Sequence, residues 1–167
     1  MIGHVQSNKA KLLLSVPNLY ILETLDSKKL ASKVNKVASQ QDRILKVLVQ
    51  VVTSDEGSKI LNNSAKSGIC PSEVESLVDF VLRECAHLDF CGLMTMGKVG
   101  DIEGFQIMQK LVENLRLRFD ELREKELELS FGTSGDYKTA VLYGSTQVRV
   151  GSTIFGAREY PKMIEKM

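Results

Sequence analysis

The fold is decided by residues 127–153, which have the sequence LELSFGTSGDYKTAVLYGSTQVRVGST. Residues 127–131 (LELSF) and 146–150 (TQVRV) predict two short strands. Between them, DYKTAVLYG predicts a short helix that begins at Asp136 and ends at Gly144, a natural C-terminal cap. Strands that alternate with helices in this way indicate βαβ units and a parallel sheet.

The same alternation runs through the rest of the chain. Further strands are predicted at residues 18–23, 44–52 and 88–94; helices are predicted at 26–39 with Asp26 as N-cap, from Pro71 onward, and along the apolar stripe from Phe105 to Leu122. Residues 1–5 predict the end of another strand, which is followed at once by a helix-like segment.

The number of strands predicts an incomplete barrel. A complete (β/α)8 barrel usually needs about 250 residues, whereas this chain has 167 residues. We therefore expect an α/β fold, a partial (β/α)8 TIM barrel that lacks about the first two βα units. It would form a single, incomplete domain over residues 1–167, truncated at its N-terminus.

Composition and charge narrow the class of protein. The chain is 43% hydrophobic and 26% charged, and its 22 Lys and Arg balance 21 Asp and Glu. This balance predicts no nucleic-acid partner. The apolar runs are far below the roughly 18 residues that span a membrane, and the N-terminus does not resemble a signal peptide. We therefore expect a protein without membrane association.

The cysteines predict the cellular compartment, and the histidines indicate whether a metal site is present. Cys70, Cys85 and Cys91 form no CxxC pair, and an odd number of cysteines is typical of a reducing compartment. His4 and His87 share no ligand spacing with the cysteines, so no metal site is predicted. The expected location is cytoplasmic, unless an organellar targeting segment has been lost.

Two turns rich in glycine and hydroxyl groups follow the last two predicted strands. They are residues 132–135 (GTSG), before the helix that opens at Asp136, and residues 151–153 (GST). Free backbone N–H groups, hydroxyls and a helix N-terminus favour an anion, and barrel enzymes commonly hold a phosphate after their last two strands. The alternative is that these residues serve only the turns, through positive φ angles and capping.

Arg149 lies within the last predicted strand. Strand alternation places it on the face opposite to Val148 and Val150. It therefore either lines the barrel near its mouth or lies on an exposed end. A buried guanidinium needs an anion or another acceptor, and a structural salt bridge is the simpler alternative to a ligand contact.

Four motifs extend the prediction to a family. They are IGHVQSNK at 2–9, GLMTMG at 92–97, LSFGTSGD at 129–136 and GSTQVRVGSTIFG at 144–156. They resemble the segments IGxLQxNK, GLMTIG, LSMGMSxD and GSTxVRxGSTIFG of the pyridoxal phosphate homeostasis proteins, also called the proline synthase co-transcribed family. The resemblance runs from residue 2 to about residue 162.

The resemblance implies a barrel like the N-terminal domain of alanine racemase, with one pyridoxal 5′-phosphate (PLP) at its mouth. In that family the groups that match Ser134, Gly151 and Ser152 hold the phosphate, and the arginine that matches Arg149 faces the pyridine nitrogen. A permanently charged guanidinium disfavours protonation of that nitrogen, which makes the ring a weaker electron sink. The implied role is to buffer PLP and deliver it to PLP-dependent apo-enzymes, without catalytic turnover.

The sequence departs from the family pattern in three places. The family's covalent Schiff-base lysine lies in a VSKTKP-like segment that would precede Met1. Phe131 and Thr133 replace the two methionines of LSMGMS. The loop after the strand at 44–52 is expanded, so that either Lys59 or Lys66 could match the family's loop lysine. These departures predict weak, non-covalent PLP binding.

Two other functions remain open from the sequence. A full-length racemase-like or lyase-like enzyme would need an acid/base pair on opposite faces of the ligand, and Tyr137 and Tyr160 are the nearby phenols. A truncated product without function is the second alternative. For the truncated PLP-binding protein, barrel edges without a neighbouring strand also predict self-association.

Overall fold

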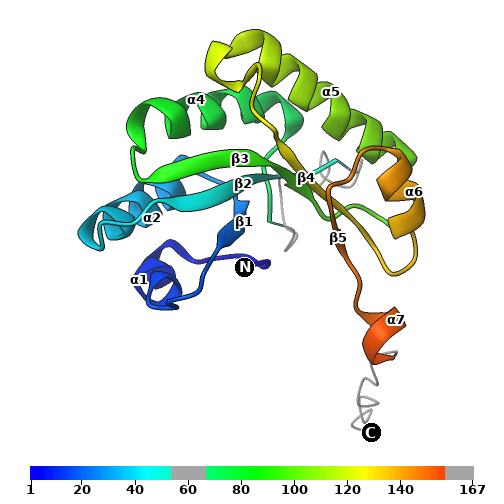
Figure 1. Ribbon diagram of the computed structural model, residues 1–167, viewed down its shortest axis with the longest axis horizontal. Coiled ribbons are helices and arrows are strands. Elements are labelled where there is room, and N and C mark those ends of the chain that lie inside the picture. Colours follow the sequence, from blue (N-terminus) through cyan, green and yellow to red (C-terminus); the bar gives the residue numbers. More distant parts are fainter. Residues whose placement is uncertain (54–66, 157–167) are drawn as a thin grey trace, which may run out of the picture.

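The computed structural model describes residues 1–53 and 67–156. Within them, five strands form one sheet in sequence order (Figure 1). The strands are β1 (Ile21–Leu25), β2 (Leu45–Val51), β3 (Leu88–Thr95), β4 (Glu128–Thr133) and β5 (Gln147–Arg149). Each of them overlaps a predicted strand. All four neighbouring pairs are parallel, so each connection has to return the chain along the sheet.

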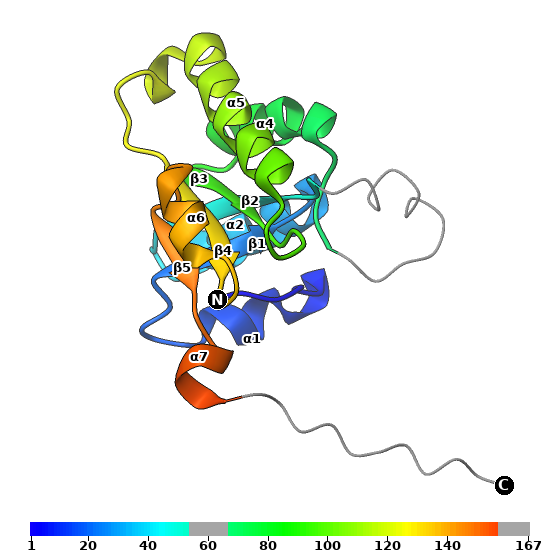
Figure 2. The ribbon, with the colours of Figure 1, turned by 90° about the vertical axis from the view of Figure 1, so that its right-hand side faces the viewer.

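Helices make these returns and cover the outer face of the curved sheet (Figures 1 and 2). The helical elements are η1 (Ser7–Lys9), α1 (Ala10–Leu14), α2 (Lys28–Gln40), η2 (Pro71–Glu73), α4 (Val74–Glu84), α5 (Ile102–Arg118), η3 (Asp120–Leu122), α6 (Tyr137–Leu142) and α7 (Ser152–Phe155). The described part is thus the curled, open part of a (β/α)8 barrel, as predicted. None of its helices is long and apolar enough to cross a membrane.

Two predicted helix ends are wrong in detail. Ser27, rather than Asp26, caps α2, because its hydroxyl accepts a hydrogen bond from the N–H of Leu30 at 3.2 Å. The apolar stripe predicted for the longest helix continues to Leu122, whereas α5 ends at Arg118. The 3₁₀ turn η3 keeps Leu122 buried after the α-helix has ended.

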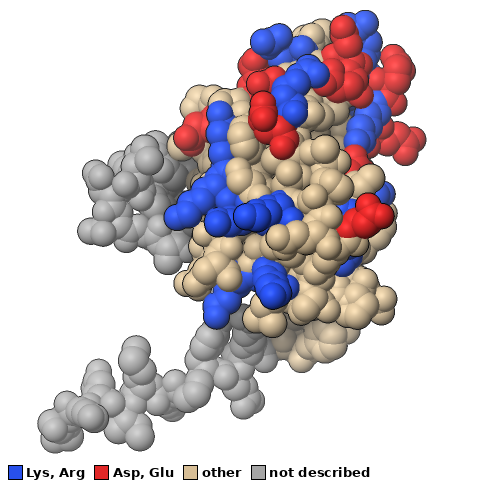
Figure 3. Space-filling view, turned by 90° about the vertical axis from the view of Figure 1, so that its left-hand side faces the viewer, with Lys and Arg blue, Asp and Glu red and all other residues tan. Residues whose placement is uncertain are grey.

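The main core lies between the sheet and its helices. Phe90 and Phe131 are the largest side chains buried there, and the inward faces of α2, α4 and α5 pack over them. The outer face of α2 is basic rather than apolar. Its four lysines are exposed, as expected for an amphipathic surface helix. Figure 3, which looks at this side of the molecule, shows these basic side chains on the surface.

One glycine is required by the close approach of two strands. Gly92 in β3 has a φ of +148°, and a Cβ atom built on it would lie 2.0 Å from the carbonyl oxygen of Glu128 in β4. No side chain fits there without moving the neighbouring backbone.

The first residues extend the sheet beyond β1. The amino group of Met1 donates to the carbonyl of Ile21 at 2.6 Å, and the N–H of Glu23 donates to the carbonyl of Met1 at 3.0 Å. This is the hydrogen-bond pattern of a parallel neighbour. The predicted strand end at residues 1–5 therefore pairs as expected, although it is too short to count as a strand.

Candidate functional site

The two predicted anion-binding turns meet at the carboxyl ends of β4 and β5. The hydroxyl oxygen of Ser134 accepts hydrogen bonds from the N–H of Gly151 at 2.9 Å and from the N–H of Thr153 at 3.3 Å. Ser152 lies between these two residues at the start of α7 and is exposed. The structure thus brings Ser134 and Gly151 together. It adds the Thr153 amide, which belongs to the predicted GST turn but is not among the groups that the resemblance assigns to the phosphate.

Asp136 fixes the first of these turns. Its carboxylate accepts hydrogen bonds from the N–H of Thr133 at 2.6 Å, from the Thr133 hydroxyl at 3.0 Å and from the N–H of Gly100 at 2.8 Å. Burial alone would raise the pKa of Asp136, but these hydrogen bonds and the charge of Arg149 outweigh it and hold the pKa below its ordinary value. The ionised carboxylate therefore ties the β4–α6 turn to the loop that precedes α5.

The side chain of Arg149 lies on the concave side of the sheet, where its hydrogen-bond partners are neutral groups. Its Nη1 donates to the Ser130 hydroxyl at 2.8 Å, and its Nη2 donates to the Thr95 carbonyl at 2.7 Å. Burial lowers the pKa of Arg149, and the charges of Glu23 and Asp136 offset this in part. No ion pair with Arg149 is found within residues 1–53 and 67–156. Of the two placements that the sequence left open, the structure shows the one that lines the barrel, and within the described residues the hydrogen-bond partners of Arg149 are neutral.

A hydrogen bond across the concave face links β1 to β4. The Ser130 hydroxyl donates to Oε2 of Glu23 at 2.6 Å, although two strands lie between β1 and β4. In a flat sheet these strands would be about 14 Å apart, so the contact requires the sheet to curl. Sequence reasoning missed both residues, but Glu23 is the one charged residue of the strand segment ILETL. That charge could have drawn attention to it.

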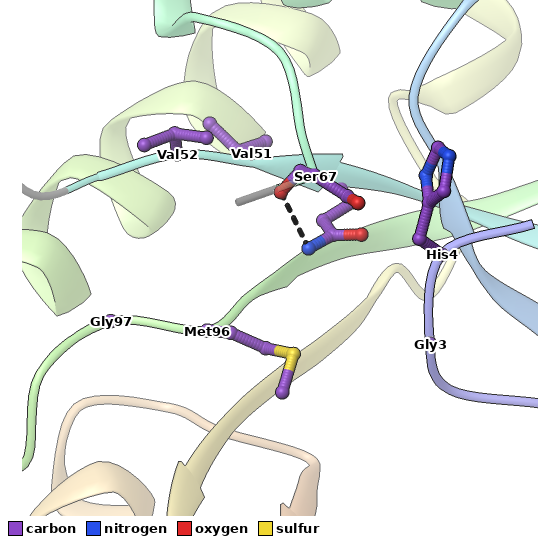
Figure 4. Close-up of a pocket in the computed structure, with 8 residues that line it drawn as sticks. Gly3, His4, Val51, Val52, Ser67, Met96 and Gly97 are labelled. Carbon is purple, nitrogen blue, oxygen red and sulfur yellow. Dashed lines mark hydrogen bonds between the residues drawn. The ribbon is translucent and has the colours of Figure 1, made fainter. Parts of the chain in front are cut away.

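A cavity of about 420 Å³ opens at the same end of the sheet, toward β1–β3 (Figure 4). It is lined by Gly3, His4, Gln50, Val51, Val52, Ser67, Met96 and Gly97. His4 Nδ1 lies 3.1 Å from Oδ2 of Asp26, and Nε2 of Gln50 donates to the Ser67 carbonyl at 2.8 Å. The carboxyl end of the sheet thus carries two features side by side. They are the hydrogen-bonded turns after β4 and β5, and a cavity with polar and apolar lining residues toward β1–β3.

Two of the residues that depart from the family pattern have local structural roles. Phe131 stacks on Phe105 with ring centroids 4.6 Å apart, in the outer core. Thr133 supplies two of the hydrogen bonds to Asp136. Tyr137 begins α6 and is half-buried. The other residues named from the sequence, Lys59, Lys66 and Tyr160, lie outside the described residues.

Comparison with known families defines the class of protein. The family described as alanine racemase, N-terminal domain, matches residues 2–159. The chain therefore belongs to this family, as its motifs and its curled parallel sheet predict.

Within this family, the chain is similar to proteins that share one name. The chain is 43% identical to the human pyridoxal phosphate homeostasis protein, over 96% of this chain and 58% of that protein. It is 40% identical to the Schizosaccharomyces pombe protein of the same name, over 96% of this chain and 65% of that protein. The chain thus spans about three fifths of the length of these relatives.

Solved structures agree with this assignment. A crystal structure described as an unknown protein from Bifidobacterium adolescentis matches with a TM-score of 0.77 and 30% identity, over 92% of this chain and 59% of that one. PipY of Synechococcus elongatus, in a structure with PLP bound, matches with a TM-score of 0.64 and 27% identity, over 93% and 69%. Clostridium difficile alanine racemase, at 16% identity over 95% of this chain and 39% of that one, has a TM-score of 0.64 and shares the fold.

Proposed function

We propose that this chain binds PLP at the carboxyl ends of β4 and β5. Ser134, Gly151 and Ser152 would hold the phosphate, with the Thr153 amide as a further donor. The observation that carries this proposal is the convergence of the Gly151 and Thr153 N–H groups on one point, the Ser134 hydroxyl oxygen. Backbone N–H groups that converge in this way suit a phosphate oxygen.

Arg149 would face the pyridine nitrogen of the cofactor. Its guanidinium is partly buried and bonded to two neutral acceptors, so its charge is not neutralised by a direct carboxylate contact. A guanidinium has five N–H donors, and within residues 1–53 and 67–156 two of its nitrogens have hydrogen-bond partners. The residues present therefore fit a ligand that offers an acceptor atom near Arg149 and a phosphate at Ser134.

The role we propose is PLP homeostasis rather than catalytic turnover. PLP is a reactive aldehyde, and a protein that holds it can limit its side reactions and pass it to PLP-dependent apo-enzymes. The names of the curated relatives and the PLP-bound structure of PipY support this role. The three cysteines are free thiols, which agrees with a reducing, cytoplasmic location.

The binding we propose for residues 1–167 is weak and non-covalent, through the Ser134 turn, the Gly151 and Thr153 amides and Arg149. Self-association through the sheet edge at β5 is part of the same proposal. Near that edge Leu142, Ile154 and Phe155 are 85%, 67% and 86% exposed. Exposed apolar side chains beside a strand edge favour pairing with a second chain.

A titration of the purified chain with PLP tests the proposal. Absorbance would follow binding, and borohydride reduction with peptide mapping would report any covalent lysine. We expect saturable binding that Ser134→Ala weakens, with no single lysine labelled. One labelled lysine would reveal a substitute covalent anchor, and an absence of saturable binding would contradict the proposed function.

A further inference from the structure

Three strands that are distant in the sequence meet at one buried hydroxyl. Ser130 in β4 is fully buried; its Oγ donates to Oε2 of Glu23 at 2.6 Å and accepts from Nη1 of Arg149 at 2.8 Å. A serine hydroxyl has one proton to donate, and an ionised carboxylate and a guanidinium have fixed acceptor and donor roles. The direction of both hydrogen bonds is therefore determined: Arg149 donates to Ser130, which donates to Glu23.

This chain of hydrogen bonds fixes the plane of the Arg149 guanidinium. One nitrogen is held by Ser130, and another is held by the Thr95 carbonyl at 2.7 Å. Because the guanidinium is planar, two contacts on different nitrogens set its orientation. The first contact depends on the rotamer of the Ser130 hydroxyl, and Glu23 is the acceptor that selects that rotamer.

We propose that Glu23 is a positioning residue for the ligand that Arg149 faces. It orients Arg149 through Ser130 and supplies a countercharge one hydroxyl away. This inference rests on the proposed PLP site and adds to it a residue of β1, at the other end of the strand order on the same concave face. Because the carboxylate bonds to Ser130, it does not take up the N–H groups of Arg149 that have no partner among the described residues, and these stay available to a ligand acceptor.

Two substitutions of Glu23 distinguish its role as hydrogen-bond acceptor for Ser130 from the effects of its size and charge. Glu23→Gln keeps an oxygen acceptor for Ser130, whereas Glu23→Ala removes it and leaves the hydroxyl free to rotate. A matched control is Glu75→Ala: Glu75 lies on α4, its side chain is 59% exposed, and it pairs with Arg118 on the outer surface. This control removes a carboxylate far from the concave face.

The experiment measures the affinity of the full chain for PLP, the absorbance spectrum of bound PLP, and the affinity for inorganic phosphate. We expect Glu23→Ala to weaken PLP binding about three- to tenfold, the range for the loss of one orienting hydrogen bond, and to shift the spectrum of the bound ring. Glu23→Gln should restore most of the affinity. Inorganic phosphate should bind all variants equally, because Ser134 and Gly151 do not contact Glu23.

The outcomes distinguish this inference from the proposed function. If Glu23→Ala binds PLP with wild-type affinity and spectrum, Glu23 is merely structural and the inference is wrong, even if the variant melts at a lower temperature. If Glu23→Gln is as impaired as Glu23→Ala, positioning through the hydrogen bond is wrong. If the wild-type chain binds no PLP, the proposed function itself fails.

Discussion

The two faces of the sheet differ in what they contain. On the outer face, a continuous apolar core joins the sheet to α2, α4 and α5. On the inner face, the buried apolar cluster consists of Ile21, Leu48, Cys91 and Met94. Next to this small cluster lie Glu23, Ser130 and Arg149. The difference indicates that folding free energy comes mainly from the outer face, while the inner face is free to carry polar groups that suit a ligand.

The largest expected effect is on the outer face. Phe131→Ala removes a fully buried ring that stacks on Phe105, and should lower the free energy of unfolding by about 3–5 kcal/mol. Urea unfolding followed by circular dichroism measures this loss. The control is Leu117→Ala on α5, since Leu117 is 82% exposed, and it should change stability by less than about 0.5 kcal/mol. Equal losses in the two variants would contradict the assignment of the core.

A smaller loss of stability is expected at Asp136, which joins the β4–α6 turn to the loop before α5. Asp136→Asn weakens charge-assisted hydrogen bonds to Thr133 and Gly100, and should lower the free energy of unfolding by about 1.5–3 kcal/mol at pH 7. Because the folded-state pKa of Asp136 lies below its ordinary value, its contribution is present above that ordinary value and is lost as the pH falls through the folded pKa. The difference between wild type and variant should therefore shrink in acid.

Urea unfolding at pH 7 and at about pH 3 checks this dependence. Asp79→Asn is the control, because the Asp79 side chain is 56% exposed on α4. A difference between wild type and Asp136→Asn that grows in acid would show that the carboxylate is not stabilised in the folded state.

On the inner face, ligand affinity should change while stability does not. Ser134→Ala removes the hydroxyl on which the Gly151 and Thr153 N–H groups converge. We expect PLP affinity to fall about tenfold, which corresponds to about 1.4 kcal/mol, with a change in stability below about 0.5 kcal/mol. Calorimetric titration and urea unfolding measure the two quantities. Ser72→Ala, at an exposed position in η2, is the control. Unchanged PLP affinity in Ser134→Ala would contradict the proposal that this turn holds the phosphate.

At neutral pH the smallest expected effect is the titration of Cys91, in the inner cluster, which changes stability only in base. Burial and a hydrogen bond to Asp89 raise the pKa of the Cys91 thiol from 9.0 to about 11. The folded state thus keeps a proton that the unfolded state loses, so this contribution to stability is complete below pH 9 and is lost as the pH rises to about 11.

The difference between wild type and Cys91→Ala isolates this contribution from other groups that titrate in base. Urea unfolding at pH 8 and at about pH 10.5 should show a steeper loss of stability in the wild type than in Cys91→Ala. Cys70→Ala, at a half-buried position outside both cores, should follow the wild type. If Cys91→Ala also follows the wild type, the thiol is not shielded as the structure indicates.

Sequence patterns predicted the outer face well and the inner face in part. The apolar run at 44–52 predicted β2, because strands of a parallel sheet are buried on both faces and appear as largely apolar segments. The short segment LELSF at 127–131 predicted β4. The apolar stripe of α5 predicted the buried residues beyond the helix end, because η3 keeps the same side chains turned inward. Local chemistry does not decide between adjacent caps, so Asp26 and Ser27 could not be separated; His4 pairs with Asp26 from 22 positions away.

The candidate site shows the same division. Ser134 and Gly151 could be predicted to lie close together, because turns after adjacent parallel strands share one edge of the sheet. The Glu23–Ser130 contact could not, since it joins residues 107 positions apart and depends on how strongly the sheet curls. Curvature results from the packing of all the strands and leaves no signature in any one of them.

Hydrogen–deuterium exchange of the full chain with and without PLP tests the division between the two faces most directly. We predict that PLP slows exchange at residues 133–136 and 149–153, on the inner edge, and leaves α4 and α5 unchanged. Protection of α4 or α5, or an equal effect of PLP on the Ser134→Ala variant, would contradict the placement of the ligand at this edge of the sheet.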